Sequence, residues 1–245
     1  MISKQQLKDL RRYRMAKYCL ADALFTAEGE KVCGELLDSD YEIVAVCALA
    51  EWISMHTCKL DSTNCHEVGQ RELEMLSTLQ TPNKVWMLVR RKSTQPTSWN
   101  EPLTLILDHL QDPGNMGTII RTADWYGVRQ IICSRDTVDC YNSKVVQSAM
   151  GSLFRTHLHY TVLADWLDRY DGAVYGAVLD GVPIDNTQWK QPAALVIGNE
   201  SRGIHPDLQK HLTHRITIPN RGGTAESLNA AVATGILLHT LTGHQ

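Results

Sequence analysis

No stretch of this 245-residue sequence is long and apolar enough to cross a membrane. The longest strongly apolar segment runs from Ile43 to Ala50, whereas a transmembrane helix needs about 20 apolar residues. The first residues, from Met1 to Lys8, also lack the apolar core of a signal peptide. We therefore expect a soluble, cytoplasmic protein.

The sequence also lacks a disulfide or zinc pattern. Its cysteines number seven, an odd count, and contain no Cys-x-x-Cys pair. In a chain of this length that usage is typical of reduced, mostly buried thiols.

An excess of positive charge is missing as well. Lys and Arg total 24 against 27 Asp and Glu, a net charge of −3, so any binding of nucleic acid must come from a local patch. The nucleotide and hydrolase signatures Gly-x-Gly-x-x-Gly, Gly-x-x-x-x-Gly-Lys-Ser/Thr and Gly-x-Ser-x-Gly are all absent, which argues against a dinucleotide enzyme, a P-loop nucleotidase and a serine hydrolase.

What is present is an α/β pattern in two parts. Residues 1–92 predict a small α/β domain, residues 93–102 a polar linker with two prolines, and residues 103–245 a second domain. In the first part we expect helices over 3–20, 30–37, 48–56 and 68–79 and strands over 41–46 and 84–90. In the second, strands near 103, 130, 157, 173, 194 and 215 alternate with helices, which predicts a mainly parallel sheet covered on both faces.

The first helix carries a one-sided run of positive charge, with a single Asp9 opposing it: Lys4, Lys8, Arg11, Arg12, Arg14 and Lys17. Such a run is either a solvated helix face or a phosphate-contacting surface. We single out Arg11, Arg12 and Arg14 as RNA-binding candidates.

Three strand-to-helix connections in the second part are rich in glycine and polar residues: 112–121, 195–203 and 216–229. Each taken alone is an ordinary turn with a helix cap, for which Asn115 and Ser227 are suitable residues. In a parallel sheet all three emerge at the same edge and can form one pocket. Two histidines, His157 and His159, share one face of an expected strand, and without an acidic or cysteine partner we interpret them as structural rather than metal ligands.

These loops resemble the three ordered motifs of the SpoU (TrmH-like) RNA 2′-O-ribose methyltransferases of the SPOUT superfamily. The motifs are Asp112-Pro-x-Asn-x-Gly-x-x-x-Arg121, Gly198-x-Glu-x-x-Gly203 and Ile218-Pro followed by Ser227-Leu-Asn229. The resemblance covers residues 103–245, and the N-terminal part is similar, more loosely, to the substrate-binding domain of such enzymes. Many members have a methionine where Asn220 stands and a loop one residue shorter before Ser227.

The resemblance implies an α/β fold whose parallel-sheet domain contains a deep trefoil knot, preceded by a small α/β RNA-binding domain resembling a ribosomal protein. It implies S-adenosylmethionine as cofactor, no metal, a homodimer and a ribose 2′-hydroxyl in rRNA or tRNA as methyl acceptor. The implied cofactor contacts are Gly198, Ile218 and Leu228. The implied catalytic residues are Asn115, Arg121, Glu200, Ser227 and Asn229.

Physical chemistry leaves the role of the arginine open. Mechanisms described for the family often make it the base, but a guanidinium with a pKa above ~12 is almost never deprotonated. We therefore expect Arg121 to grip the adjacent phosphate and stabilise charge on the 2′-oxygen, with Asn115 orienting it. Glu200 would hold Arg121, take the proton through water, or simply pair with Arg202. Two alternative functions remain: a non-catalytic RNA-binding protein on this scaffold, and a knotted base methyltransferase.

Overall fold

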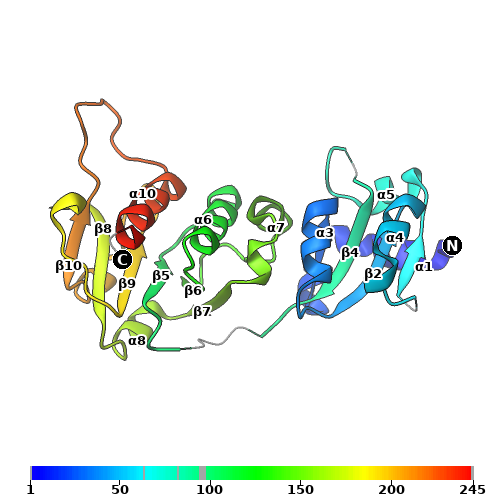
Figure 1. Cartoon of the computed structure of the whole chain (residues 1–245), viewed down its shortest axis with the longest axis horizontal. Helices are drawn as coiled ribbons and strands as arrows, with labels where there is room; N and C mark the ends of the chain where they lie inside the picture. The colour runs from blue at the N-terminus through cyan, green and yellow to red at the C-terminus, as the bar shows by residue number, and fades with distance from the viewer. Residues whose placement is uncertain (1, 63, 82, 94–97, 244–245) are drawn as a thin grey trace. The chain divides into compact units, whose positions relative to one another are not determined.

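The chain forms two compact units in the computed structural model, which describes residues 2–62, 64–81, 83–93 and 98–243. The first unit holds the described residues up to Ser93 together with Tyr141–Phe154, and the second holds the remaining described residues (Figure 1). Residues 94–97 of the expected linker lie outside the described part. Over the described residues, no helix has the length and apolar character needed to cross a membrane.

The first unit is built on a four-stranded sheet in the order β1-β4-β2-β3. Its strands are β1 (Leu24–Glu28), β2 (Ile43–Ala48), β3 (Cys65–Glu67) and β4 (Val85–Arg90). The β1–β4 and β2–β4 pairs are antiparallel, whereas β2 and β3 are parallel. Its helices are α1 (Lys4–Arg11), α2 (Ala16–Ala21), α3 (Glu30–Leu37), α4 (Ala50–His56) and α5 (Gln70–Leu76), with short 3-10 turns η1 (Arg12–Arg14) and η2 (Thr57–Lys59).

The long first helix expected over residues 3–20 is broken in the structure. A capping box at Ser3 starts α1, but Met15 is extended (φ −99°, ψ 120°), so the chain passes through η1 and begins again as α2. Strand β1 was not expected from the sequence. Its buried Glu28 is satisfied by the hydroxyls of Ser77 and Thr78 and by the Thr78 amide, which explains how a strand can contain a buried carboxylate.

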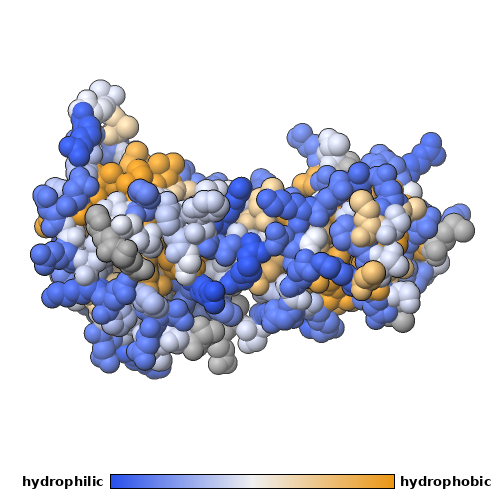
Figure 2. Space-filling model, viewed as in Figure 1, coloured by the Kyte–Doolittle hydropathy of each residue, from blue (hydrophilic) through white to orange (hydrophobic). Residues whose placement is uncertain are grey.

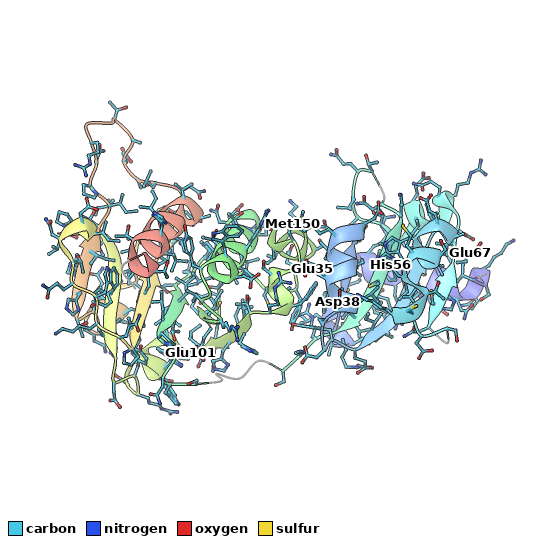
Figure 3. The ribbon with its side chains drawn as sticks, viewed as in Figure 1. Glu35, Asp38, His56, Glu67, Glu101 and Met150 are labelled. Atoms are coloured by element: carbon cyan, nitrogen blue, oxygen red, sulfur yellow. The ribbon has the colours of Figure 1, made fainter. Side chains whose placement is uncertain are left out.

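Residues 141–154 pack with the first unit although they come late in the sequence. They form α7 (Ser143–Ala149) and the turn η3 (Ser152–Phe154). The ring of Tyr141 stacks on Phe25 with centroids 4.7 Å apart, and Gln147 donates a hydrogen bond of 2.7 Å to the carbonyl of Glu28. Figure 3 labels Glu35 on α3 and Met150 just after α7. The expected boundary at residues 93–102 assigned all later residues to the second domain, so it did not predict that residues 141–154 belong to the first unit.

The second unit is built on a six-stranded sheet in the order β10-β8-β9-β5-β6-β7. The strands are β5 (Leu103–Leu107), β6 (Gln130–Ser134), β7 (His157–Thr161), β8 (Ala173–Pro183), β9 (Ala193–Ile197) and β10 (His214–Thr217). Every neighbouring pair is parallel, as expected. The helices are α6 (Pro113–Trp125), α8 (Leu163–Leu167), α9 (Pro206–Gln209) and α10 (Ala230–Thr242), with the 3-10 turn η4 (Ile184–Asn186).

Parallel strands covered on both faces are buried along their length. Strands β6 and β9 are buried at every residue, and one core cluster joins Ile106, Ile132 and Val196 to Trp166 of α8. The end of the expected linker docks on this unit, because Trp99 stacks on Trp166 at 5.1 Å. Because the sheet is parallel, the loops after β5, β9 and β10 leave it at the same edge.

Candidate active site

Helix α6 starts earlier than the sequence pattern suggested. It begins at Pro113, so Gly114 and Asn115 form its first turn instead of a separate Pro-Gly-Asn turn. The N-cap is Asp112, whose carboxylate accepts a hydrogen bond of 2.7 Å from the Asn115 amide. The alternative in which Asn115 only caps the helix does not hold, because Asp112 followed by proline supplies the cap. The Asn115 side chain is left available for other contacts.

Asn115 links the other two loops through its carboxamide. Its Nδ2 donates a hydrogen bond of 2.7 Å to the Glu200 carboxylate, and its Oδ1 accepts one of 2.9 Å from Nδ2 of Asn229. We call this chain, Asn229–Asn115–Glu200, the polar relay. The three residues are separated by 85 and 114 positions along the chain, and the fold brings them together at one edge.

Asn229 serves a second purpose as the N-cap of α10. Its Oδ1 accepts hydrogen bonds from the amides of Ala231 and Val232 at 2.9 and 3.3 Å. The expected cap at Ser227 is therefore wrong, and the final helix begins at Ala230 rather than at Ser227. Because capping already fixes the Asn229 side chain, its Nδ2 points at Asn115 with no additional loss of side-chain entropy.

The loop after β9 is folded tightly around Glu200. An Asn199–Gly203 bridge closes it with backbone hydrogen bonds of 3.1 and 2.9 Å. A side chain at Gly198 would place its Cβ only 2.3 Å from the Gly203 carbonyl carbon, so only glycine fits there. Among the described residues no ion pair joins Glu200 to Arg202, and the Glu200 side chain accepts its hydrogen bond from Asn115 alone.

A cavity of about 700 Å³ opens beside the relay, between the loops after β9 and β10. Gly198, Glu200, Ile218, Ser227 and Leu228 all line it, so the fold brings together the three expected cofactor contacts and two of the expected catalytic residues. Figure 1 shows the long loop between β10 and α10 that forms one side of it. The size is typical of a pocket for a drug-sized ligand.

Arg121 lies apart from the relay. It is exposed two turns into α6, and its guanidinium makes no hydrogen bond or ion pair within the described part of the chain. Trp125, one turn further along the same helix face, is 84% exposed. The structure thus does not bring Arg121 into contact with Asn115 or Glu200.

The three N-terminal arginines differ in their surroundings. Arg12 donates hydrogen bonds of 2.7 and 2.8 Å to the Tyr13 hydroxyl and the Asp22 carboxylate, whereas Arg14 reaches the Met75 carbonyl at 3.3 Å. Arg11 is exposed at the end of α1. Their RNA-binding role stays a prediction.

His157 and His159 lie on β7 as expected. Over the described residues, no group of three or more His, Cys, Asp or Glu side chains is arranged to hold a metal ion.

Asn199 and Asp112 were missed by sequence reasoning. Asn199 holds its loop in shape, since its Oδ1 accepts from the amides of Ser201 and Arg202 while its Nδ2 donates 2.9 Å to the carbonyl of His109. Asp before Pro is the pattern that indicates a helix N-cap, and Asn in a Gly-Asn step just after a strand is a residue type that favours such a turn.

A parallel α/β sheet whose loops enclose an apolar cavity beside a polar relay is the architecture of an enzyme that binds a nucleotide-like cofactor. Comparison with known proteins specifies the class further. Residues 102–239 match the model of the SpoU rRNA Methylase family, and residues 4–86 match the MRM3-like substrate binding domain. The chain belongs to the SpoU rRNA Methylase family.

Relatives match along nearly the whole chain. The 23S rRNA (guanosine(2553)-2′-O)-methyltransferase RlmP of Bacillus subtilis is 29% identical, over 98% of this chain and 96% of its own. A Porphyromonas gingivalis protein assigned to the TrmH family of RNA methyltransferases has a TM-score of 0.89 and 36% identity, covering all of both chains. An rRNA methyltransferase from Sinorhizobium meliloti, solved with S-adenosylmethionine bound, has a TM-score of 0.86 and 28% identity, covering 100% of this chain and 97% of its own.

The expected family, the activity class of an RNA 2′-O-ribose methyltransferase and the expected cofactor are thereby confirmed. The cavity fits S-adenosylmethionine by its chemistry. Its apolar walls include Ile197, Ile218 and Leu237, which suit the faces of an adenine ring, and the Glu200 carboxylate suits a positively charged sulfur.

Proposed function

We propose that the polar relay is the methyl-acceptor side of the active site, and that the substrate is a ribose in structured ribosomal RNA. The observation that carries this proposal is the relay itself, in which Asn115 holds the Glu200 carboxylate at 2.7 Å on the wall of the cavity. Ribosomal rather than transfer RNA is supported by the full-length similarity to a 23S rRNA methyltransferase.

The cavity residues divide between cofactor and acceptor. Gly198, Ile218 and Leu228 would hold S-adenosylmethionine through backbone groups and apolar contacts. When bound, this cofactor supplies a methyl group activated by a sulfonium cation. Ser227 lies on the same wall and would hydrogen-bond the ribose or the cofactor. Holding the oxygen, carbon and sulfur in line is the main catalytic task.

Glu200 is the group best placed to receive the proton of the 2′-hydroxyl, directly or through water. Asn229 fixes the orientation of Asn115. Asn115 in turn donates its hydrogen bond to Oε1 of Glu200, so Oε2 is left to accept the proton. A general base is effective when its orientation is fixed by a second group in this way. Arg121 is not needed as the base in this arrangement and would bind the phosphate next to the reacting ribose.

A homodimer is supported by the exposed apolar surface of α6 and α10. Trp125, Val232 and Ile236 are 84%, 52% and 38% exposed, and Val232 and Ile236 are one turn apart on α10. Figure 2 shows apolar residues gathered over this helix. Exposed apolar residues that gather in one patch are typical of interaction sites. We infer that a second copy covers them and that Arg121, on the neighbouring face of α6, completes the partner's site.

A deep trefoil knot in the second unit is part of the same proposal. The sheet order places β8 between β9 and β10, so the chain passes from β9 back across β8 to β10. It then returns to pack α10 on α6, where Gly235 faces Thr122. Such threading is rare in proteins and is the arrangement that the family resemblance implies.

The first unit would dock the RNA through its basic first helices, as its match to a substrate-binding domain supports. Its resemblance to a ribosomal protein belongs to the same proposal. An RNA substrate and seven free cysteines together support a cytoplasmic location.

The test uses purified protein, S-adenosylmethionine with a labelled methyl group, and protein-free ribosomal RNA or transfer RNA as substrates. We expect label in ribosomal RNA, at a nucleotide whose 3′ phosphodiester resists alkali because its 2′-oxygen carries the methyl group. Label on a base indicates a base methyltransferase, label in transfer RNA alone overturns the substrate assignment, and absence of label with intact cofactor binding indicates a non-catalytic protein.

A further inference from the structure

A second cavity, of about 660 Å³, opens at the same edge of the parallel sheet. It lies at the carboxyl ends of β5, β6 and β7, and Asn199, Arg202 and Gly203 of the loop after β9 line both this cavity and the cofactor cavity. The loop that carries Glu200 is therefore a shared wall. No residue of the polar relay lines the second cavity, so neither cofactor binding nor proton transfer by the relay uses it.

Its floor contains a buried carboxylate. Asp108 is only 5% exposed, and its Oδ2 accepts a hydrogen bond of 2.7 Å from the His205 amide. Within the described residues, the other oxygen, Oδ1, accepts no hydrogen bond, and it is not among the fully buried polar atoms. Because Asp108 lines the cavity, this oxygen is accessible to a donor group of a ligand.

The backbone beside Asp108 is held in an uncommon conformation. His109 has φ +56°, and three contacts keep it there: its amide donates to Ser134 Oγ at 2.9 Å, its carbonyl accepts from Asn199, and its Nδ1 lies 2.7 Å from Asp136. Strain of this kind in a non-glycine residue clusters at functional sites. Asp136 also lines the cavity and adds a second carboxylate.

The rim carries the opposite charge. Arg135 and Arg202 are exposed and line the cavity, and in the described part of the chain neither guanidinium has a hydrogen bond or ion pair. The carboxylate oxygens inside the cavity suit the N–H donors of a nucleotide base. The unpaired guanidinium groups at its rim suit the phosphate, which is an anion. Guanine fits best, because its Watson–Crick edge presents adjacent N–H donors and single-stranded bases are read on that edge.

We propose that this cavity binds a guanine nucleotide of the substrate RNA close to the methylated ribose, with Asp108 accepting from the base and Arg135 binding the phosphate. This inference rests on the proposed function only in taking the nucleotide to be part of RNA. Because Asn199 joins the shared loop to His109, a base in this cavity would also steady the loop that carries Glu200.

The test measures binding of the four nucleoside 5′-monophosphates to the full-length protein by calorimetry, with cofactor present at saturation. We expect GMP to bind about tenfold or more tightly than AMP, CMP or UMP, since a matched base edge discriminates by roughly that factor. Asp108→Asn, which keeps an acceptor for the His205 amide but offers an NH₂ group to the base, should abolish the preference for GMP. Asp171→Asn, on the exposed surface outside both cavities, is the matched control and should leave it unchanged.

The proposal is overturned by the absence of a preference for GMP or by an unaltered preference in Asp108→Asn. It is also overturned if GMP binds only when S-adenosylmethionine is left out, because this result would place GMP in the first cavity. If Asp108→Asn fails to fold, Arg135→Gln is tested instead. This variant should bind GMP more weakly than the wild type does, with its affinity for guanosine unchanged. Ribosomal RNA should displace GMP, and retention of GMP would overturn its assignment to RNA. Cofactor affinity and methyl transfer are measured separately, so failure here does not depend on failure of the proposed activity.

Discussion

At the residue scale, Asn115 is the position on which the active site depends most. It both accepts from Asn229 and donates to Glu200, and no other residue type offers both groups at that length. Asn115→Asp removes the donor and places a second carboxylate against Glu200.

We expect Asn115→Asp to lower kcat by ~100-fold or more, the usual scale for loss of one oriented polar group, with cofactor affinity within about twofold of wild type. Steady-state methyl transfer and calorimetry with S-adenosylmethionine measure the two effects. The exposed Asn100→Asp is the matched control. Equal loss of cofactor binding would show that Asn115 only supports the fold of the pocket.

Arg121 makes a different prediction, because its exposure suits a phosphate contact rather than a base. Arg121→Lys should keep part of the affinity for RNA but show no substantial gain in rate at high pH. A strong rescue of the rate above pH 9 would favour an amine base and contradict the phosphate role. The pH dependence of kcat/KM for RNA is the measurement.

Asp108 allows a prediction about stability and pH. Burial raises the pKa of Asp108 above its ordinary value of 3.8, although the hydrogen bond from the His205 amide acts in the opposite direction. The folded protein therefore holds this proton more tightly than the unfolded chain does. Wild-type stability is lost as pH rises from about 3.8 through the folded pKa. Asp108→Asn has no such proton. The free energy of unfolding of Asp108→Asn minus that of the wild type should therefore increase across this pH window and become constant above it.

Urea unfolding of both proteins between pH 3.5 and pH 7 measures this difference directly. Because all other titrating groups are shared, they largely cancel in the comparison. A difference that stays constant with pH, or that shrinks as pH rises, would contradict the raised pKa.

At the element scale, the turn after α7 is under conformational constraint. Gly151 has φ +95°, and a Cβ there would lie 2.6 Å from Cγ and 2.8 Å from Cβ of Glu35. Gly151→Ala should therefore destabilise the first unit by roughly 1–3 kcal/mol. Gly34→Ala is the matched control: it lies within α3 with nothing near its Cβ position, and should stabilise by about 0.5–1 kcal/mol. Thermal unfolding of both variants should show shifts of opposite sign, and shifts of the same sign would contradict the account.

The elements also show what sequence patterns can and cannot predict. Helix 30–37 and the strands of the second unit follow from apolar periodicity, because one unbroken run of residues decides each of them. The start of α6 could not be predicted in this way, because Asp-Pro-Gly-Asn is equally typical of a loop turn and of the capped first turn of a helix. Strand β1 was missed because its Glu28 is balanced by Ser77 and Thr78, nearly fifty residues away. The residues of the site could be predicted from motifs, whereas their mutual hydrogen bonds depend on the fold.

At the scale of the whole molecule, the chain has an exposed apolar surface on α6 and α10 that a second copy would cover. Ile236→Glu should convert a dimer to a monomer, because burying an unpaired carboxylate in an apolar interface is strongly unfavourable. Leu20→Glu makes the same change at a 67% exposed leucine of the first unit and should leave the assembly intact. Sedimentation equilibrium at micromolar concentration distinguishes them, and a monomeric wild type or a dimeric Ile236→Glu would contradict the homodimer.

If the polar relay directs methyl transfer to a ribose 2′-oxygen, the product of the enzyme depends on Asn115. Mass spectrometry of nucleosides from ribosomal RNA, treated with S-adenosylmethionine and either wild type, Asn115→Asp or Asn100→Asp, tests it most directly. We predict one 2′-O-methylated nucleoside with wild type and with Asn100→Asp, and almost none with Asn115→Asp. A methylated base, or equal product from all three proteins, would contradict the account.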